Sequence, residues 1–270
     1  MYKFTTNGPI ATAVRMPGGN CRITAGGPGA TVQVQPAAAE RTADRRAAAG
    51  TTVTFDGGRL TVRVPPRAGW RPAWIRGRVR VEIGLPADSR VEFDSGSAGL
   101  DVHGRVTALR IDTGSGDIRA EHVGGDVSVH SSSGAVRLGL VDGDVTVNTG
   151  SGDLRVERVT GSVRCNSSSG DTDLGTTEGD VDLAAGSGSL QIGMARGGTV
   201  RAGTSSGRVT VGAQEGVGVR PELRTSSGTC SGELVNGAPA SSGGRELTLR
   251  ISTASGDIDV HRAAGQPSRY

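Results

Sequence analysis

Residues 116–160 read GDIRAEHVG GDVSVHSSS GAVRLGLVD GDVTVNTGS GDLRVERVT, a unit of nine residues repeated without a break. Each unit starts with glycine. The same step continues from Gly161 to Gly197, gains one residue, and resumes at Gly207 and Gly216. A fixed short period is typical of solenoid proteins, in which each repeat adds one structural element to a stack.

Within the unit, the third and fifth positions are apolar and the fourth is polar, as in Val145, Thr146 and Val147. Alternation with a period of two predicts a short strand with one buried face. We expect the glycine to supply the positive φ of a tight corner, and the Asp or Ser beside it to hydrogen-bond the backbone of the turn.

Pairs of units form a longer period, because Ser-Gly recurs every 18 residues, at Ser115-Gly116, Ser133-Gly134 and Ser151-Gly152. A single strand cannot bury its own apolar face, whereas stacked coils bury a continuous core between two sheets. The sequence therefore predicts an all-β fold. We expect a single-chain β-solenoid, a β-helix-like stack of about 18-residue coils that each contain two nine-residue half-repeats.

The chain divides by regularity into three parts. Residues 1–98 hold less regular strands and nearly all the aromatic residues, and they predict an N-terminal β cap with a loop at 65–78. Within this cap, the alanine- and charge-rich residues 37–50 predict a short surface helix. Residues 99–262 predict the regular repeats, and 263–270 a flexible tail.

Four segments resemble a known bacterial family: TGSGDIRAEHVGGDVSV (113–129), TGSGDLRV (149–156), ASGDIDV (254–260) and the lead-in VRVEIGLPADSRVEF (79–93). The family is a β-strand-repeat domain of unknown function, common in actinobacteria and named "putative adhesin". The likeness covers most of the chain and is strongest over 79–262. It implies the repeat fold and a role in surface adhesion. It brings no catalytic residues.

Composition narrows the class of protein. Glycine occupies 45 positions and aromatic residues only 3%, which disfavours a helical bundle. No apolar run is long enough for a membrane span, and the N-terminus does not read as a signal peptide, so we expect a cytoplasmic protein. The net charge of +3 is too weak for non-specific nucleic-acid binding, and no specific nucleic-acid partner is expected.

Neither a cofactor nor a metal is expected. Calcium-binding β-rolls also repeat every nine residues, but their GGxGxDxUx pattern is missing from this chain. The three cysteines, Cys21, Cys165 and Cys230, lie too far apart for a metal site. Cys165 and Cys230 occupy inward positions of the repeat, so we expect both to be buried as small hydrophobic residues.

No catalytic residue is expected either, so the chain is predicted not to be an enzyme. Residues 203–207, GTSSG, match the nucleophile elbow G-x-S-x-G, but that motif requires a strand-to-helix turn and Asp and His partners. Here it reads as another Ser-Ser-Gly corner of the repeat.

One segment is a candidate contact site. Three prolines push the loop at 65–78 off the stack, and this loop carries clustered arginine and tryptophan, which are frequent binding anchors. The candidate residues are Arg67, Trp70, Arg71, Trp74, Arg76 and Arg78. The alternative is a cap loop whose tryptophans cover the end of the core.

The function that these features favour is a non-enzymatic β-solenoid scaffold or interaction module, adhesin-like, whose partner is an unidentified protein or an anionic surface. Two alternatives remain open. One is a cytoplasmic filament that self-assembles through the solenoid ends. The other is a polysaccharide-acting β-helix enzyme, which the lack of clustered carboxylates and aromatics in the repeats disfavours.

Overall fold

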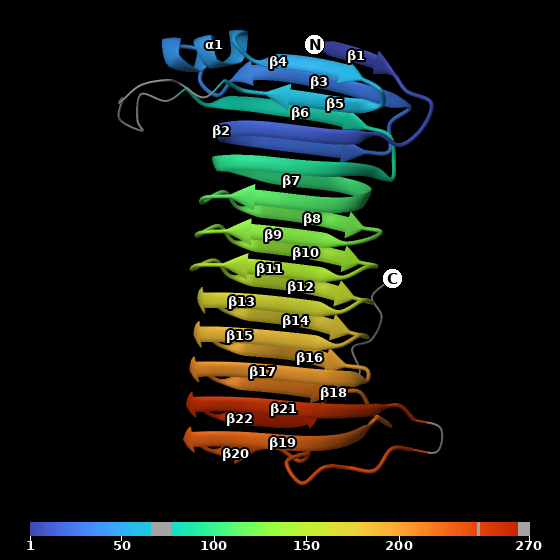
Figure 1. Ribbon diagram of the computed structural model, residues 1–270, viewed down its shortest axis with the longest axis vertical. Coiled ribbons are helices and arrows are strands. Elements are labelled where there is room, and N and C mark those ends of the chain that lie inside the picture. Colours follow the sequence, from blue (N-terminus) through green and yellow to red (C-terminus); the bar gives the residue numbers. More distant parts are fainter. Residues whose placement is uncertain (66–76, 242–243, 264–270) are drawn as a thin grey trace. The chain divides into compact units, whose positions relative to one another are not determined.

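The computed structural model describes residues 1–65, 77–241 and 244–263 (Figure 1). In this part of the chain, 22 strands and one helix form an all-β fold. The chain divides into two compact units, 1–138 and 139–270, and β10 (Val136–Val141) contains the boundary. Each unit is a stack of parallel β-coils, which confirms the predicted β-solenoid. The units are described separately below.

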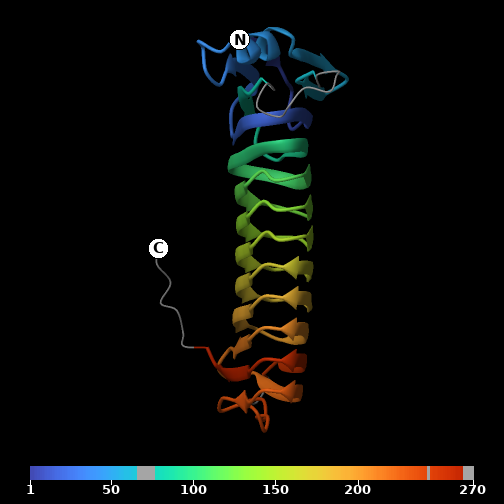
Figure 2. The ribbon, with the colours of Figure 1, turned by 90° about the vertical axis from the view of Figure 1, so that its left-hand side faces the viewer.

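In the second unit, parallel strands form two ladders. One contains, in spatial order, β11 (Val145–Thr149), β13 (Val163–Ser169), β15 (Val181–Ser187), β17 (Gly198–Ser206), β21 (Glu246–Ser255) and β19 (Gly218–Ser227). The other contains β12 (Leu154–Val159), β14 (Thr172–Thr177), β16 (Leu190–Ala195), β18 (Val209–Ala213), β22 (Ile258–Arg262) and β20 (Cys230–Ser231). Figure 2 shows the two ladders on opposite sides of the stack.

The register of the ladders has the period seen in the sequence. Val145 pairs with Val163, and Val163 pairs with Val181, so each coil is 18 residues long. Val181 then pairs with Val200, one residue later than the period predicts. Gly197 and Gly198, with φ of 145° and 83°, absorb this extra residue in conformations that side chains other than glycine rarely adopt.

The core lies between the ladders, as the alternation predicts. Val145 and Val147 are buried, whereas Thr146 between them is half-buried on the outer face. The other inward positions are also mostly small aliphatic residues. Each fully buried Val or Leu contributes about 1.5–3 kcal/mol relative to an exposed one, so a thin core repeated in every coil can hold the stack.

The Asp that follows the repeat glycine bonds to the next coil. Asp153 Oδ1 accepts the backbone N–H of Asp171 (3.1 Å), and Asp171 Oδ1 accepts that of Ser189 (2.8 Å). The same contact recurs from Asp117 to Ala135, Asp144 to Ser162, Asp180 to Thr199 and Asp257 to Thr229. These carboxylates therefore do hydrogen-bond corner backbone, as predicted, but that of the neighbouring coil.

The repeat glycines are required for a reason other than the predicted one. Among the repeat glycines described from Gly116 to Gly216, three have a positive φ within the left-handed range: Gly188 (149°), Gly197 (145°) and Gly216 (79°). What excludes a side chain is the adjacent coil: a Cβ on Gly207 would lie 2.0 Å from the Gly188 carbonyl oxygen. A Cβ on Gly256 would lie 2.1 Å from the Gly207 carbonyl oxygen. The prediction of a positive φ was wrong for most corners. Glycine is needed there because the adjacent coil leaves no room for a side chain.

The first unit contains the less regular strands. They are β1 (Tyr2–Thr5), β2 (Ala11–Ala25), β3 (Gly29–Pro36), β4 (Thr52–Asp56), β5 (Arg59–Arg63), β6 (Val79–Leu85), β7 (Ser89–Thr113), β8 (Ile118–Val123) and β9 (Val127–Ser131). β2 is a complete coil, which pairs in parallel with β5 and β6 on one side and with β7 on the other.

Antiparallel strands close the outer end of the first unit. β4 pairs with β5, β3 pairs with β6, and β1 pairs with β3, all antiparallel. Phe4 of β1 stacks on Phe55 of β4, with ring centroids 5.2 Å apart. This is the predicted aromatic-bearing β cap, which covers strand edges that would otherwise be free to pair with other chains. The predicted helix is α1 (Thr42–Ala49). No helix of the described residues is long and apolar enough to span a membrane.

The last coil of the chain is not the last coil of the stack. β21 and β22 lie between β17 and β18 on one side and β19 and β20 on the other (Figure 1). The chain therefore skips one level after β18, forms the outermost coil, and returns to fill the level that it skipped. Residues 246–262 belong to the predicted repeats, but the sequence does not predict that this returning coil is inserted between two earlier levels.

The cysteines follow the prediction in part. Cys21 and Cys165 are buried, and burial raises the pKa of both thiols, which keeps them in the unreactive protonated form. Cys230 is exposed, so its predicted burial was wrong. It lies in β20, the outermost strand of its ladder among the described residues, where no further coil covers an inward position.

Candidate functional site

The predicted contact loop lies mostly outside the described residues. Arg67, Trp70, Arg71, Trp74 and Arg76 belong to that part of the chain, so their role stays a prediction. Arg78 is described and exposed, just before β6. The structure thus gives the end of the loop and its immediate surroundings.

A buried carboxylate fixes the backbone at Arg78. Asp44 of α1 is fully buried, and its Oδ1 accepts the backbone N–H of Arg78 (2.9 Å) while its Oδ2 accepts that of Ala38 (3.1 Å). The Arg78 carbonyl oxygen in turn accepts the N–H of Ala37 (3.0 Å). These bonds hold α1 against the chain that leads into β6. Backbone donors satisfy the carboxylate, so Asp44 serves the structure at this point.

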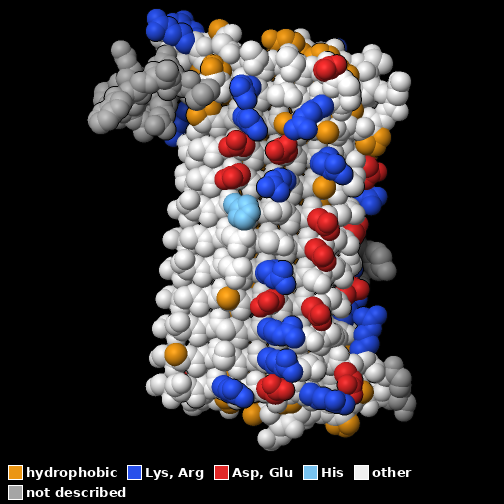
Figure 3. Space-filling view, in the orientation of Figure 1, with side chains coloured by type: hydrophobic (Ala, Val, Ile, Leu, Met, Phe, Trp, Pro, Cys, Tyr) orange, Lys and Arg blue, Asp and Glu red, His pale blue; other side chains and the backbone are white. Residues whose placement is uncertain are grey.

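Exposed arginines surround this anchor. Arg45 and Arg46 lie on α1, Arg63 ends β5, and Arg80 lies on β6 beyond Arg78. We call these five residues the α1 basic surface. In Figure 3, Lys and Arg side chains lie at the corner where Figure 1 places α1. Of these five, sequence reasoning counted Arg78 among the candidate contact residues and saw Arg63 and Arg80 beside the loop. It missed Arg45 and Arg46, although the Arg-Arg pair inside the predicted helix was a signal for them.

The net charges of the two halves of the chain support a binding surface in the first unit. Residues 1–138 contain 18 Lys and Arg against 12 Asp and Glu, whereas residues 139–270 contain 12 against 15. The modest net charge of the whole chain therefore conceals a basic first half. Opposite signs in two halves of a chain indicate that a charged partner is attracted to one of them.

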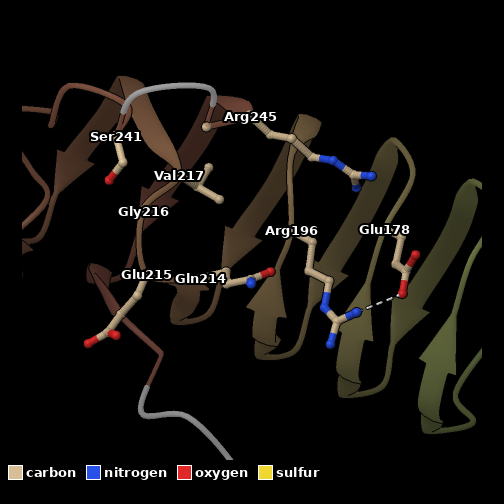
Figure 4. A pocket seen from close by; sticks show the side chains of 9 residues that line it. Glu178, Arg196, Gln214, Glu215, Gly216, Val217, Ser241 and Arg245 are labelled. Carbon is tan, nitrogen blue, oxygen red and sulfur yellow. Dashed lines mark hydrogen bonds and ion pairs between the residues drawn. The ribbon is translucent and has the colours of Figure 1, made fainter.

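A pocket of about 460 Å³ opens in the second unit, close to where β21 enters the stack (Figure 4). It is lined by Glu178, Arg196, Gln214, Glu215, Gly216, Val217, Ser241, Gly244 and Arg245. The irregular stretch APASSGGRE (238–246) indicates a break in the repeat. It gives no sign that this stretch and residues 214–217 line one pocket.

Two arginines organise the pocket. Arg196 Nη1 bonds Glu178 Oε1 at 2.9 Å, whereas Arg196 Nε is buried without a hydrogen-bond partner. Arg262 supports the wall from behind, since its Nη1 donates to the carbonyl oxygens of Gln214 (2.9 Å) and Val217 (2.8 Å). The pocket is therefore preformed and rich in donors.

Other reactive side chains do not assemble into a centre within the described residues. No group of three or more His, Cys, Asp or Glu could hold a metal ion in that part of the chain. His103 pairs with Glu121 (2.8 Å), where the Gly104 N–H and then His103 hold the pKa of that carboxyl below its usual value. Ser205 of the GTSSG sequence lies exposed in strand β17, not on a strand-to-helix turn.

Comparison with protein families places the chain. The family model described as Toastrack DUF4097 matches residues 27–261. The chain belongs to the Toastrack DUF4097 family. The match includes all four segments that carry the resemblance found in the sequence, which is thereby confirmed. No curated protein matches this Toastrack chain.

Solved structures similar to this Toastrack chain share little sequence with it. A "putative adhesin" from Bacteroides fragilis is 11% identical, with 96% of this chain and 95% of that one covered and a TM-score of 0.49. A "putative adhesin" from Parabacteroides distasonis is 13% identical, with 96% and 95% covered and a TM-score of 0.32. A "putative cell adhesion protein" from Clostridium sporogenes is 9% identical, with 97% of each chain covered and a TM-score of 0.26.

Proposed function

We propose that this Toastrack chain is a non-enzymatic β-solenoid binding module that contacts an anionic partner through the α1 basic surface. The observation that carries the proposal is the bond from the buried Asp44 to the backbone of Arg78, which fixes the exposed Arg78 against α1, the helix that carries Arg45 and Arg46. A preformed surface loses little conformational entropy on binding, and arginine suits phosphate and carboxylate groups.

The rest of the first unit supports the same function. The antiparallel cap seals the strand edges beside α1, so this end is available for contacts other than strand pairing. Only the pair Arg45 and Arg46 lies on a helix, where both can be replaced without breaking a strand ladder. These two residues are therefore the best place to test the proposal.

We expect the double variant Arg45→Gln, Arg46→Gln to weaken binding to anionic vesicles by about thirtyfold, because each of the two basic residues near such a surface contributes about 1 kcal/mol. The measurement is co-sedimentation with phosphatidylcholine vesicles containing about 30 mol% phosphatidylglycerol, at low salt and at about 0.5 M salt, where screening should abolish binding.

The matched control removes the same charge elsewhere. Arg164 and Arg201 are exposed on strands of the second unit, and Arg164→Gln with Arg201→Gln should bind as the unchanged protein does. Equal loss of binding in both double variants would show a general charge effect and contradict the α1 basic surface. No binding of the unchanged protein at low salt would reject the anionic surface as partner.

A second candidate function is self-assembly, favoured by the edge of β19. One side of β19 pairs with β21. On the other side, the described residues supply only an isolated bridge, from Val219 to Ala238. Leu223, at an inward position of the strand, is half-exposed. An unpaired edge of this kind can accept a strand from another copy.

We expect Leu223→Lys to abolish such assembly, because an inward-pointing charge on an edge strand opposes stacking of a further coil. Sedimentation velocity over a range of protein concentrations measures the effect. Thr210→Lys adds the same charge to the outer face of β18 and should leave assembly intact. A monomer at every concentration of the unchanged protein would rule out this second candidate.

The proposal also includes the cellular compartment of the protein. We retain the cytoplasmic location expected from the sequence as a prediction. An anionic membrane surface or an acidic protein would both be available to the α1 basic surface there.

A further inference from the structure

The pocket of the second unit exists because the chain skips a level of the stack. After β18 the chain passes through Gly216, whose φ of 79° needs glycine, and begins β19 one level further on. Gly218 N–H donates to the Arg245 carbonyl oxygen (2.9 Å), and Ser241 N–H donates to that of Gly216 (3.0 Å). The outgoing and returning segments are thus tied together around a recess whose walls do not follow the repeat.

Polar groups without protein partners line this recess. Arg196 Nε is buried and has no hydrogen-bond partner, and Figure 4 shows the Gln214 side chain pointing toward Arg196. Arg245 forms no ion pair with the other described residues. A buried N–H left unpaired costs about 1–3 kcal/mol, so a ligand oxygen at this place would relieve that cost.

The charges favour an anion over a cation. Glu178 is occupied by Arg196, and Figure 4 shows the Glu215 side chain directed away from Arg245. Arg262 adds a further positive charge behind the wall, where its guanidinium donates to the backbone carbonyl oxygens of Gln214 and Val217. Arg196, Arg245 and the Gln214 amide all line the pocket, and their N–H donors suit the two oxygens of a carboxylate.

We propose that this pocket binds the carboxylate of a small hydroxylated acid, specifically a uronic acid. The volume of about 460 Å³ accommodates one or two sugar rings. Ser241 and the Gln214 side-chain oxygen can bond ring hydroxyls while the arginines hold the carboxylate. The site lies in the second unit and does not depend on the α1 basic surface.

The experiment titrates the full chain with D-glucuronate and with D-glucuronamide, its uncharged analogue, and follows binding by calorimetry and ligand-observed NMR. We expect glucuronate to bind saturably and at least about tenfold more tightly than glucuronamide, because charge-assisted bonds are about twice as strong as neutral ones. Arg245→Gln should reduce the affinity for glucuronate by about tenfold. An oligouronate that competes would assign the carboxylate to a polysaccharide, and one that does not would assign it to a free acid.

Arg220→Gln is the matched control, because Arg220 is exposed, pairs with Glu246 at 2.7 Å and does not line the pocket. It should bind glucuronate as the unchanged protein does. Circular dichroism confirms that each variant keeps its β structure. Equal affinity for glucuronate and glucuronamide, an unchanged affinity in Arg245→Gln, or no saturable binding would each overturn the proposal, and none of these results bears on vesicle binding through α1.

Discussion

Gly207→Ala is expected to destabilise the protein by about 3 kcal/mol, an unusually large effect for the addition of one methyl group. The new Cβ would lie 2.0 Å from the Gly188 carbonyl oxygen of the adjacent coil. Real Cβ atoms do not approach backbone oxygen so closely, so the two coils must separate at this corner. The Gly188 N–H to Ser206 bond (3.2 Å) and the Gly207 N–H to Ser255 bond (3.3 Å) are at the same corner and would be strained with it.

Gly203→Ala is the control. Gly203 lies four residues earlier, inside β17, which ends at Ser206 just before Gly207. Among the described residues other than its own chain neighbours, a Cβ at this position would have one atom within 4 Å, Ser252 Oγ at 3.5 Å, which is ordinary contact. We expect a change within about 0.5 kcal/mol. Urea unfolding measures both variants, with comparison of midpoints at a constant slope. Similar losses from the two substitutions would mean that glycine serves these strands through its backbone freedom rather than through close stacking.

The regular coils are the part of the fold that the sequence predicts best. Each inward position, such as Val145 or Val163, makes the same contacts as its equivalent one coil away, so period alone determines both the strand and its register. The glycine corners were located correctly for the wrong reason. A pattern in one chain segment shows where a side chain is excluded, but the oxygen that excludes it lies in a neighbouring coil.

The inserted coils could not be predicted, because the repeat pattern does not show in which spatial order the coils stack. β2 near the N-terminus and the β21–β22 coil near the C-terminus each pair on both sides, so neither is an outermost coil. Their inward residues match any neighbouring coil equally well, since all coils share small aliphatic residues at these positions. Their place depends on whether the connecting segments, such as 232–245, can reach a given level.

The candidate sites also differ in whether a short stretch of sequence reveals them or only the stacking of distant segments does. Arg78 was found from local composition, because arginine and proline near tryptophan are visible in a short window of sequence. The pocket depends on Arg196, Gln214 and Arg245, which come from three different levels of the stack. They line one pocket only because the chain skips a level after β18. Asp44, which positions Arg78, was read as part of a surface helix although it is fully buried.

Val145→Asp is expected to have the largest effect in the second unit. Val145 is buried in β11, directly beside Val163 of the next coil, so the carboxylate would enter the core without a charged or hydrogen-bonding partner. Burial of an unpaired charge costs several kcal/mol, and we expect a loss of about 4 kcal/mol or more. The equivalent position is filled in every neighbouring coil, so the disturbance should extend beyond β11, and hydrogen exchange should show it first in β13.

Thr146→Asp makes the same chemical change one residue later, on the outer face. Thr146 is half-buried and lies opposite Arg164 in the parallel register, so the new carboxylate has water and a guanidinium within reach. We expect a change of less than about 1 kcal/mol, in either direction. Urea unfolding of the pair tests the assignment of the two faces. If both variants lose the same stability, then the alternation in this strand does not separate core from surface, and the two-ladder solenoid is wrong at this coil.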